Sequence, residues 1–335
     1  MSTVAPVSAD IVFDKLFAYQ QTAALKAAID LEVFTAIDEG ARTPDAIAAR
    51  TEASERGIRI LCDFLTTIDL LEKSDGLYAL SPTSAAFLSK RSQMYLGTMA
   101  NFLVLPELKQ NFDHLTETVR TGTVRQEGNT VATENPIWLE FARAMVPMAV
   151  PAAHAIAGIL GIDSSGPTKV LDIAAGHGMY GIVLAQRNPA VEVAAADWGA
   201  VLGVAQEHAK QAGVESRFRQ IPGDAFQTDF GTGFDIALVT NFLHHFDMAQ
   251  CTTLLKKVKA ALAPSGRVAI AEFVPNDDRV TPPVAARFSL TMLAGTPQGD
   301  AYTLAQHTSM LEAAGFSGVE MHQLPTPQQV IVARA

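Results

Sequence analysis

Apolar positions follow two different periods along the chain, and the change falls between residues 162 and 168. Over residues 10–162 they recur every three or four positions, which is the spacing of helices that bury one face. Over residues 168–335 short apolar runs alternate with amphipathic segments, which predicts strands and helices in turn. We therefore expect an α/β fold, in which a helical first half precedes a mainly parallel sheet wound with helices.

The first 90 residues have the outline of a winged helix, in which three helices precede a β-hairpin. Helices are predicted over residues 10–28 and 31–38, then from Thr43-Pro44 and from Ser54. Thr43 and Ser54 are typical N-cap residues, and proline suits the first helical position. Asp75-Gly76, between two short apolar runs, predicts the hairpin.

The charge balance argues against a DNA-binding role for this domain. Residues 1–90 contain eight Lys and Arg against thirteen Asp and Glu, and the whole chain has a formal net charge of −10. A nucleic-acid-binding domain needs local positive charge to neutralise phosphates. We therefore interpret residues 1–91 as a winged-helix dimerisation domain, and we expect no nucleic-acid partner.

Composition excludes several other classes. Hydrophobic residues make up 48% of the chain, and no apolar run reaches the ~18 residues that span a bilayer. Residues 1–10 lack a basic region followed by an apolar one, so no secretion signal is expected. Two distant cysteines, Cys62 and Cys251, offer no disulfide framework, and no His/Asp/Glu cluster has metal-ligand spacing. We expect a cytoplasmic protein with no membrane partner and no metal.

The segment from Ile137 to Leu160 is apolar nearly all round, so it must be covered on every side. Two prolines, Pro147 and Pro151, are expected to kink or split it. Its large side chains are most simply core, and a dimer interface or a substrate-pocket wall are the alternatives. We interpret residues 92–165 as a helical linker that also contributes to a substrate pocket.

The motif Gly176-x-Gly178-x-x-Gly181 lies between a strand predicted over 170–173 and a helix that begins at Ile182. Glycines let the backbone approach a ligand closely, and a helix N-terminus favours anionic or polar groups. The next strand ends at Asp197, which is placed to accept hydrogen bonds from ribose hydroxyls. Residues 166–335 are therefore predicted to bind a nucleoside cofactor, and this pattern by itself also fits a dinucleotide.

Three further features resemble class I S-adenosylmethionine-dependent methyltransferases. Asp172 lies at the end of the first strand, just before the glycine turn. In Pro222–Phe226, the Asp is placed to accept from an adenine amino group and the Phe to pack on the base. Two terminal strands, over 318–324 and 329–334, have no helix between them and must pair antiparallel. The resemblance implies a Rossmann-like sheet with a reversed terminal hairpin, S-adenosylmethionine as cofactor and S-adenosylhomocysteine as product.

Two other strand ends carry the candidate catalytic pair. A strand over 235–240 runs into Asn241-Phe-Leu-His-His-Phe246, and a strand over 267–271 runs into Glu272. Here the chain resembles, over nearly its whole length, the winged-helix small-molecule O-methyltransferases, which include plant caffeate-type and bacterial secondary-metabolite enzymes. A hydroxyl is a poor nucleophile until its proton leaves, and histidine is suited to take that proton near neutral pH. The resemblance implies that His244 is the general base and that Glu272 orients its ring, with His245 as the alternative base.

The same resemblance implies a homodimer that acts on a small aromatic or hydrophobic hydroxyl compound, and it assigns the binding residues. The cofactor-binding positions are Asp172, Ala174, Gly176, Gly178, Asp197, Trp198, Gly223, Asp224, Ala225, Phe226 and Asn241. The substrate pocket is expected between the mid-chain helix and a helix over 285–293, lined by Trp138, Phe141, Met145, Met148, Phe288 and Met292.

The chain departs from the family pattern at three positions. Ala301, in the run Gln298–Thr303, stands where the family commonly has a glutamate that also flanks the histidine. Thr240 stands in place of a frequent lysine, and Ala174 in place of the first motif glycine. Transfer to nitrogen, to carbon or to an already acidic hydroxyl therefore stays open, as does a non-methylating or regulatory member of the fold. The glycine pattern also leaves an NAD(P)-dependent oxidoreductase as an alternative.

Overall fold

The computed structural model describes residues 8–335 and divides into two compact units, Met1–Val104 and Leu105–Ala335. Residues 1–7 carry most of the segment on which the expectation of no secretion signal rests, and they lie outside the described residues. The division falls after Val104. The boundaries after residues 91 and 165 were predicted from the expected roles of the segments, and they stay a prediction.

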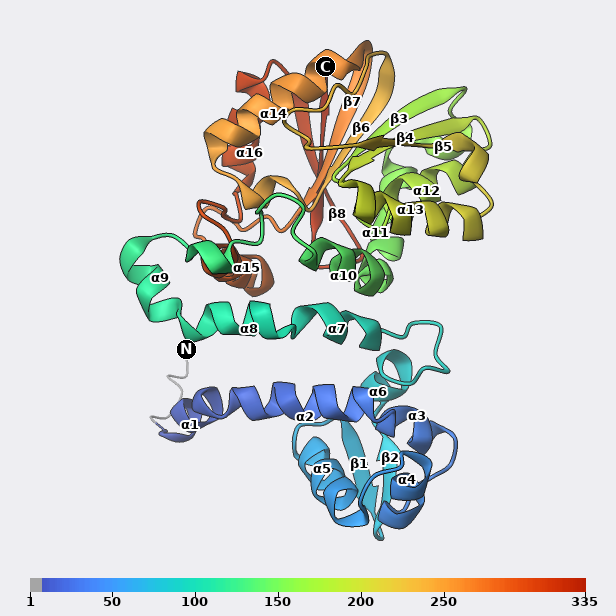
Figure 1. Ribbon diagram of the computed structural model, residues 1–335, viewed down its shortest axis with the longest axis vertical. Helices are drawn as coiled ribbons and strands as arrows, with labels where there is room; N and C mark the ends of the chain where they lie inside the picture. Colours follow the sequence, from blue (N-terminus) through green and yellow to red (C-terminus); the bar gives the residue numbers. More distant parts are fainter. Residues whose placement is uncertain (1–7) are drawn as a thin grey trace, which may run out of the picture. The chain divides into compact units, whose positions relative to one another are not determined.

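The first unit consists of helices and one hairpin, seen in the lower part of Figure 1. Its elements are α1 (Asp10–Leu16), α2 (Ala18–Asp30), α3 (Val33–Asp38), α4 (Pro44–Arg50), α5 (Glu55–Thr67), β1 (Leu71–Ser74), β2 (Leu77–Leu80), α6 (Pro82–Phe87), η1 (Gly97–Met99) and α7 (Ala100–Leu103). The helix predicted over 10–28 is interrupted at Phe17. The N-caps predicted for α4 and α5 are confirmed, because the side chains of Thr43 and Ser54 accept backbone N–H groups.

The predicted hairpin is confirmed, with β1 and β2 paired antiparallel. Asp75 and Gly76 both have positive φ, 50° and 78°, which is the backbone of a tight two-residue hairpin turn. Tyr78 of β2 is fully buried in the core of this unit, and its hydroxyl donates to Asp63 of α5 at 2.7 Å. The hairpin is thereby fixed against the helix that precedes it, as in a winged helix.

The second unit begins with helices and continues as a wound sheet. Its elements are α8 (Pro106–Asp113), α9 (Leu115–Thr121), η2 (Gln126–Gly128), α10 (Ile137–Ala144), α11 (Val146–Ile159), η3 (Ile162–Ser164), β3 (Thr168–Ile173), α12 (Met179–Arg187), β4 (Val191–Asp197), α13 (Gly199–Gln211), η4 (Glu215–Arg217), β5 (Phe218–Pro222), β6 (Phe234–Thr240), η5 (Leu243–His245), α14 (Met248–Ala261), β7 (Leu262–Glu272), α15 (Pro283–Gly295), α16 (Leu304–Ala313), β8 (Ser317–Gln323) and β9 (Gln329–Arg334).

The apolar segment predicted over 137–160 is split into α10 and α11, as its prolines indicate. Pro147 lies in the first turn of α11, where the missing N–H costs no helical hydrogen bond, and Pro151 lies within that helix. In the described part of the chain no single helix is long and apolar enough to cross a membrane. Only α10 and α11 together reach that length and composition, and they are bent by 66° at their junction.

The sheet confirms the predicted topology. Its order is β5-β4-β3-β6-β7-β9-β8, and the strands from β5 to β7 are parallel. The last two strands run antiparallel, β9 against both β7 and β8, which is the reversed terminal hairpin. Because the carboxyl ends of parallel strands meet at one edge, Asp197, Asn241 and Glu272 come to the same edge of the sheet.

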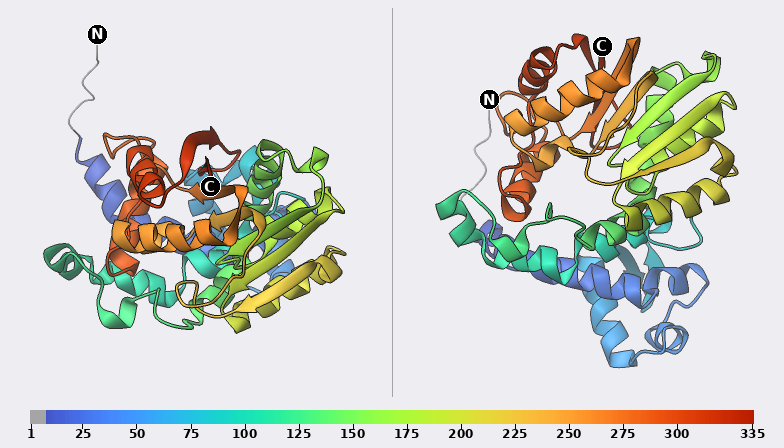
Figure 2. Two further views of the ribbon diagram at one scale, coloured as in Figure 1. Left: turned by 90° about the horizontal axis from the view of Figure 1, so that it is seen from above. Right: turned by 45° about the horizontal axis from the view of Figure 1, so that its top comes forward.

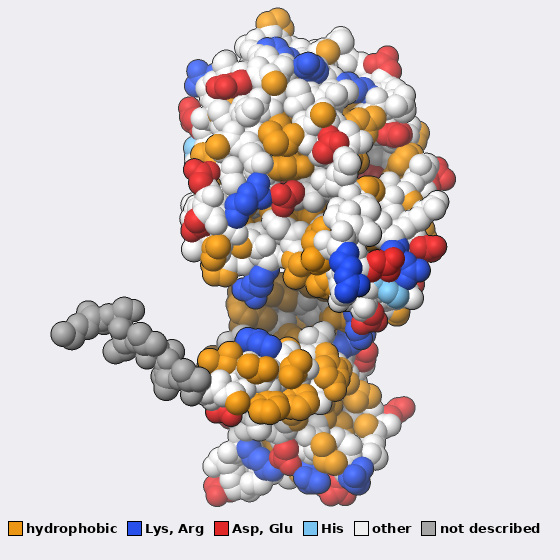
Figure 3. All heavy atoms as spheres, turned by 90° about the vertical axis from the view of Figure 1, so that its left-hand side faces the viewer, with side chains coloured by type: hydrophobic (Ala, Val, Ile, Leu, Met, Phe, Trp, Pro, Cys, Tyr) orange, Lys and Arg blue, Asp and Glu red, His pale blue; other side chains and the backbone are white. Residues whose placement is uncertain are grey.

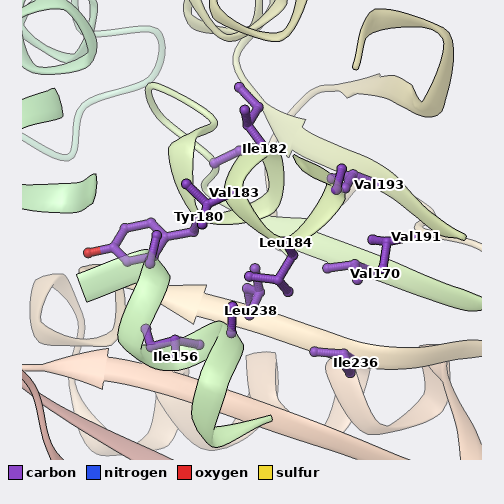
Figure 4. Packing of buried hydrophobic residues seen from close by; sticks show 14 of the residues in the cluster. Ile156, Val170, Tyr180, Ile182, Val183, Leu184, Val191, Val193, Ile236 and Leu238 are labelled. Atoms are coloured by element: carbon purple, nitrogen blue, oxygen red, sulfur yellow. The ribbon is translucent and has the colours of Figure 1, made fainter. Parts of the chain in front are cut away.

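Alternate residues of each strand fill two separate cores. On one face Val170 and Leu238 pack with α11, α12 and α13, and Figure 4 shows several of these side chains together. On the other face Leu171 and Val239 pack with α14 and α16. Figure 2 shows the twisted sheet with helices on both faces. With both faces covered, only the strand ends are left to form a binding site.

Candidate active site

The loop between β3 and α12 is a tight turn that small residues alone fit well. Gly176 and Gly178 have φ of +58° and +72°, left-handed values that glycine adopts without steric cost. A Cβ on Gly178 would lie 2.9 Å from the Cβ of Ala205 in α13, so the turn packs closely against that helix. Ala174 also has a positive φ, +52°, so it holds a strained conformation where the family pattern has glycine.

Asp172 supports this turn from within β3 and is fully buried. Its Oδ2 accepts the N–H of Gly181 at 3.0 Å, whereas its Oδ1 is buried with no hydrogen-bond partner. Burial raises the pKa of this carboxyl to about 8, and the Gly181 N–H opposes that rise. The unpartnered oxygen is therefore available to a hydrogen-bond donor, above all to a cationic one.

Asp197, the last residue of β4, faces the same turn. The N–H of Gly176 donates to its Oδ2 at 2.8 Å, and the N–H of Trp198 donates to its Oδ1 at 2.6 Å. Burial raises the pKa of Asp197 to about 6, while these two N–H groups act in the opposite direction. Each carboxylate oxygen keeps a second lone pair, so the group can also accept hydroxyls from a ligand.

The segment Gly223–Phe226 follows β5 at the same edge. The N–H of Phe226 donates to Oδ1 of Asp224 at 2.8 Å, which folds the segment into a side-chain-stabilised turn. The Phe226 ring lies edge-on to Phe246, with ring centroids 4.9 Å apart. Asp224 and Phe226 are thus held in a fixed, partly buried arrangement.

Asn241, directly after β6, connects four parts of the unit. Its N–H donates to the carbonyl of Ala271 in β7 at 2.8 Å, and its φ is +54°. Its side-chain amide donates to the hydroxyl of Tyr180 in α12 at 3.3 Å and accepts from the side chain of Gln328, just before β9. Tyr180 and Gln328 are both fully buried or nearly so, and they fix the orientation of Asn241.

Glu272, at the end of β7, organises the loop that follows β6. Its Oε1 accepts three consecutive backbone N–H groups, from Phe242, Leu243 and His244, at 3.0, 2.9 and 3.4 Å. Its Oε2 lies 2.5 Å from Nδ1 of His244. The carboxylate is therefore held at both oxygens, and it fixes the ring as well as the backbone of His244.

His245 points into a group of aromatic rings. Its ring centroid lies 4.2 Å from that of His244 and 5.0 Å from that of Trp138 in α10. Its Nδ1 is buried with no hydrogen-bond partner. Burial, and secondarily the neighbouring His244, hold the pKa of His245 well below its usual value, so the ring is neutral.

Other predicted pocket residues extend this aromatic group. Phe288 of α15 lies edge-on to the His244 ring at 4.8 Å and stacks on Phe273 at 4.2 Å. Phe141 lies 5.8 Å from Trp138 and stacks on His177 at 5.9 Å, so it connects the histidine pair to the glycine turn. Met145 and Met292 are buried and Met148 is half-buried, and their pocket role stays a prediction.

The run Gln298–Thr303 supports the histidine loop through its backbone. A Cβ on Gly299 would lie 2.2 Å from the carbonyl oxygen of His244, so only glycine fits there. The Tyr302 hydroxyl donates to the carbonyl of Phe246 at 2.5 Å, and Asp300 pairs with Arg279 at 2.8 Å. Ala301, at the usual glutamate position, is fully buried. This chain therefore holds the loop by close packing where the family pattern has a second carboxylate.

A third buried histidine, His307 of α16, lies beyond this run. Both of its ring nitrogens are buried with no hydrogen-bond partner, and burial lowers its pKa to about 4. Its ring lies edge-on to Tyr302 at 6.0 Å. Among the residues that the structure describes, no group of three or more His, Cys, Asp or Glu side chains is placed to hold a metal ion.

Sequence profiles of two domains match this arrangement. A profile described as an O-methyltransferase domain matches residues 138–317, which is more than half of the chain. A profile described as an O-methyltransferase dimerisation domain matches residues 13–90.

The chain belongs to the O-methyltransferase family. This confirms the resemblance on which the site was predicted, and it confirms an S-adenosylmethionine-dependent O-methyltransferase as the class of enzyme. The dinucleotide alternative for the glycine turn is thereby set aside.

Solved structures and curated relatives agree with the family. A candidate O-methyltransferase from Nostoc punctiforme is 46% identical, with a TM-score of 0.95 over 98% of this chain and 100% of that chain. Human N-acetylserotonin methyltransferase, solved with S-adenosylmethionine, shares the fold at 21% identity and a TM-score of 0.85, over 100% and 99% of the two chains. A 3-hydroxy-5-methyl-1-naphthoate 3-O-methyltransferase from Streptomyces sahachiroi is 28% identical, over 92% of this chain and 89% of the relative.

The candidate site thus gathers the predicted strand-end residues at one edge of the sheet. Sequence reasoning missed three of its supports: Tyr180, Gln328 and Gly299. Tyr180 stands inside the glycine motif, and Gly299 stands inside the run that was compared with the family, so both were visible as positions. Gln328 has no local sequence signal, because its partner Asn241 is distant in the chain.

We predict that Gly299→Ala destabilises the protein by about 1–3 kcal/mol, which is the usual cost of overpacking. The added Cβ would lie 2.2 Å from the His244 carbonyl oxygen and 3.0 Å from the His245 carbonyl carbon, and neither backbone atom can move freely. Gly295→Ala is the control, because its nearest neighbour would be a Thr130 methyl at 3.5 Å. Chemical denaturation of the three proteins measures the difference. Equal stability of Gly299→Ala and wild type would contradict the packing described here.

Proposed function

We propose that this O-methyltransferase acts on a hydroxyl group of a flat aromatic compound, with His244 as general base and Glu272 as its positioning residue. The observation that carries the proposal is the set of hydrogen bonds to Glu272, which ties the His244 ring to the loop backbone. A buried carboxylate with both oxygens engaged holds one orientation of the imidazole. Such an orientation is what proton transfer at a defined atom needs.

The hydrogen bond to Glu272 also selects the state of the imidazole. Because Nδ1 donates to the carboxylate, the neutral ring carries its proton on Nδ1 and leaves Nε2 as the bare acceptor. An acceptor hydroxyl that donates to Nε2 would pass its proton to that atom, which leaves the oxygen as the nucleophile. The resulting imidazolium is stabilised by the adjacent Glu272 carboxylate.

The cofactor-binding half of the proposal rests on the strand-end residues. When bound, S-adenosylmethionine would supply an electrophilic methyl group on a sulfonium, with the neutral thioether of S-adenosylhomocysteine as the leaving group. Oδ1 of Asp172 is buried without a partner, and it would accept a hydrogen bond from the cationic amino group of the cofactor. The carboxylate of Asp197 would accept hydrogen bonds from the ribose hydroxyls. The remaining positions of the cradle are Ala174, Gly176, Gly178, Trp198, Gly223, Asp224, Ala225, Phe226 and Asn241.

The acceptor class follows from the rings around the histidine pair. Four flat rings follow one another here. Trp138 lies 5.0 Å from His245, His245 lies 4.2 Å from His244, and His244 lies 4.8 Å from Phe288, measured between ring centroids. Aromatic side chains favour stacked or edge-on contacts with another aromatic ring. The Streptomyces sahachiroi relative is named for a hydroxynaphthoate, and a fused bicyclic phenol is the acceptor that we propose to test first.

We also propose that the enzyme is a homodimer. The dimerisation profile covers residues 13–90, and α1 together with the start of α2 exposes a run of large apolar side chains. Ile11, Val12, Phe13, Leu16, Phe17 and Tyr19 are each more than half exposed. Figure 3 shows apolar side chains gathered on one face of the first unit. Such a patch marks a protein contact.

Light scattering at micromolar concentration should give the mass of two chains, and the mass of one chain would contradict the proposal.

For catalysis, we predict that His244→Gln lowers kcat about 100- to 10,000-fold with 2-naphthol, the range expected for loss of a general base. Glu272→Gln should lower kcat about 10- to 100-fold, because the ring loses its orienting partner. Affinity for S-adenosylhomocysteine should stay within about threefold, because neither residue belongs to the cradle. Transfer of a labelled methyl group and calorimetry measure the two effects, with the exposed-residue variant Glu312→Gln as control.

A more acidic acceptor separates a base from a merely structural residue. A nitro-substituted naphthol loses its proton without help, so it should recover most of the activity of His244→Gln while wild type changes little. If His244→Gln is equally impaired with both naphthols, His244 is not the base. If wild type binds S-adenosylhomocysteine but methylates no phenol, the proposed acceptor class is wrong.

A further inference from the structure

His245 differs from the buried polar groups around it, because its Nδ1 has no hydrogen-bond partner in the protein. Leaving a buried polar atom unpaired costs about 1–3 kcal/mol. Native structures hold few such atoms, and one on a ring 4.2 Å from that of the proposed base invites the explanation that a ligand completes it. His245 is 7% exposed, so solvent does not readily supply the missing partner.

Several polar groups near His245 are engaged elsewhere. The indole N–H of Trp138 donates to the carbonyl of Thr130 at 3.0 Å. The hydroxyl of Tyr302 donates to the Phe246 carbonyl, and the thiol of Cys251 donates to the Leu243 carbonyl at 3.1 Å. The Nδ1 of His244 is bonded to Glu272. The other side chains around His245 are aromatic. Nε2 of His244 is assigned to the reacting hydroxyl in the proposed function, and Nδ1 of His245 is a second nitrogen beside it without a partner in the protein.

The two histidine rings are close enough to bind neighbouring groups on one molecule. Their centroids lie 4.2 Å apart, with the rings inclined by 61°. Phe288 covers the His244 ring and Trp138 covers the His245 ring, at 4.8 and 5.0 Å. A flat acceptor whose hydroxyl reaches Nε2 of His244 therefore brings the adjacent ring position next to His245.

We propose that His245 is a specificity-determining residue, which binds a second oxygen on the carbon next to the reacting hydroxyl. The inference rests on the proposed function, since it assumes that His244 receives the reacting hydroxyl. The acceptor class is then an aromatic 1,2-diol or an ortho-hydroxycarbonyl compound. A neutral imidazole has one donor and one acceptor nitrogen, so Nδ1 accepts from a hydroxyl in one tautomer and donates to a carbonyl in the other.

Rejection of acceptors without the second oxygen follows from the same geometry. An acceptor with only one hydroxyl leaves the buried Nδ1 unpaired, whereas the matching acceptor restores the hydrogen bond that the protein lacks. Sites that are built to bond a polar group discriminate strongly against analogues without it. A single neutral hydrogen bond corresponds to a preference of about 10- to 100-fold in kcat/KM.

The test compares 2,3-dihydroxynaphthalene with 2-naphthol, which differ only in the neighbouring hydroxyl. Full-length enzyme is assayed with S-adenosylmethionine as wild type, His245→Phe and His245→Asn. We expect wild type to prefer the diol, and we expect His245→Phe to lose about tenfold or more of that preference, measured in each protein as the ratio of kcat/KM for the diol to kcat/KM for 2-naphthol. His245→Asn should keep most of the preference, because its amide places a polar atom close to the position of Nδ1.

His307→Phe is the matched control, since it removes another buried histidine whose nitrogens are unpaired but which lies outside the loop. His307→Phe should change kcat/KM for the two acceptors by the same factor. If His245→Phe loses kcat/KM equally for both acceptors, His245 has only a packing role and the inference is overturned. The inference is also overturned if the wild type shows no preference for the diol.

Binding separates this inference from the proposed function. If wild type transfers methyl to neither naphthol, calorimetric titration of both into the complex with S-adenosylhomocysteine is the readout. Tighter binding of the diol, lost in His245→Phe, supports the role of His245 even though the methyl acceptor class was wrong. If neither naphthol binds, the proposed acceptor class and the proposed role of His245 are both overturned.

Discussion

The buried carboxylate of Glu272 is the interaction on which the catalytic end of this fold depends. It is 2% exposed, and a charge so placed is costly unless hydrogen bonds replace its water. Three loop N–H groups and one imidazole nitrogen do this at once. The loop after β6 is consequently tied to the end of β7, and His244, the proposed general base, is placed by the same bonds that satisfy the charge. Removing the carboxylate would leave those donors unpaired and release the ring.

On the cofactor side of the site, a buried carboxylate is again held by backbone N–H groups. Asp197 uses its two oxygens to join the glycine turn and the start of α13, so the cradle is formed before a ligand binds. Asp172 keeps one oxygen unpaired, and burial makes its ionised form unfavourable. A cationic group bound beside it would offset that cost. The two carboxylates therefore make the site complementary to a ligand with hydroxyls and a positive charge.

The sequence allowed the elements with strong local signals to be predicted. Thr43, Ser54 and Asp75-Gly76 fixed helix starts and a turn correctly because caps and tight turns are determined by adjacent residues. The lack of a helix between the last two strands correctly implied the reversed hairpin. Each of these predictions depends on residues within a few positions of one another.

Long-range contacts could not be predicted in the same way. The bond between Gln328 and Asn241 and the contact of Gly299 with the His244 backbone join distant segments, so no period or motif announces them. Ala301 stands where the family pattern has a glutamate that flanks the histidine, so the sequence alone did not show what else supports His244. In the structure, that run supports the loop through Gly299 and Tyr302, and Glu272 alone engages the ring of His244 among the carboxylates described.

We propose that Glu272 holds the neutral His244 ring with its proton on Nδ1 and with Nε2 free to act as a base. Nitrogen-15 NMR of histidine-labelled protein measures this directly, with His244→Gln used to assign the signals. For the neutral ring we expect a protonated Nδ1 and an unprotonated Nε2, and we expect Glu272→Gln to disturb this state. A neutral wild-type ring with its proton on Nε2 would contradict the proposed role, because Nε2 could then take no proton from the acceptor.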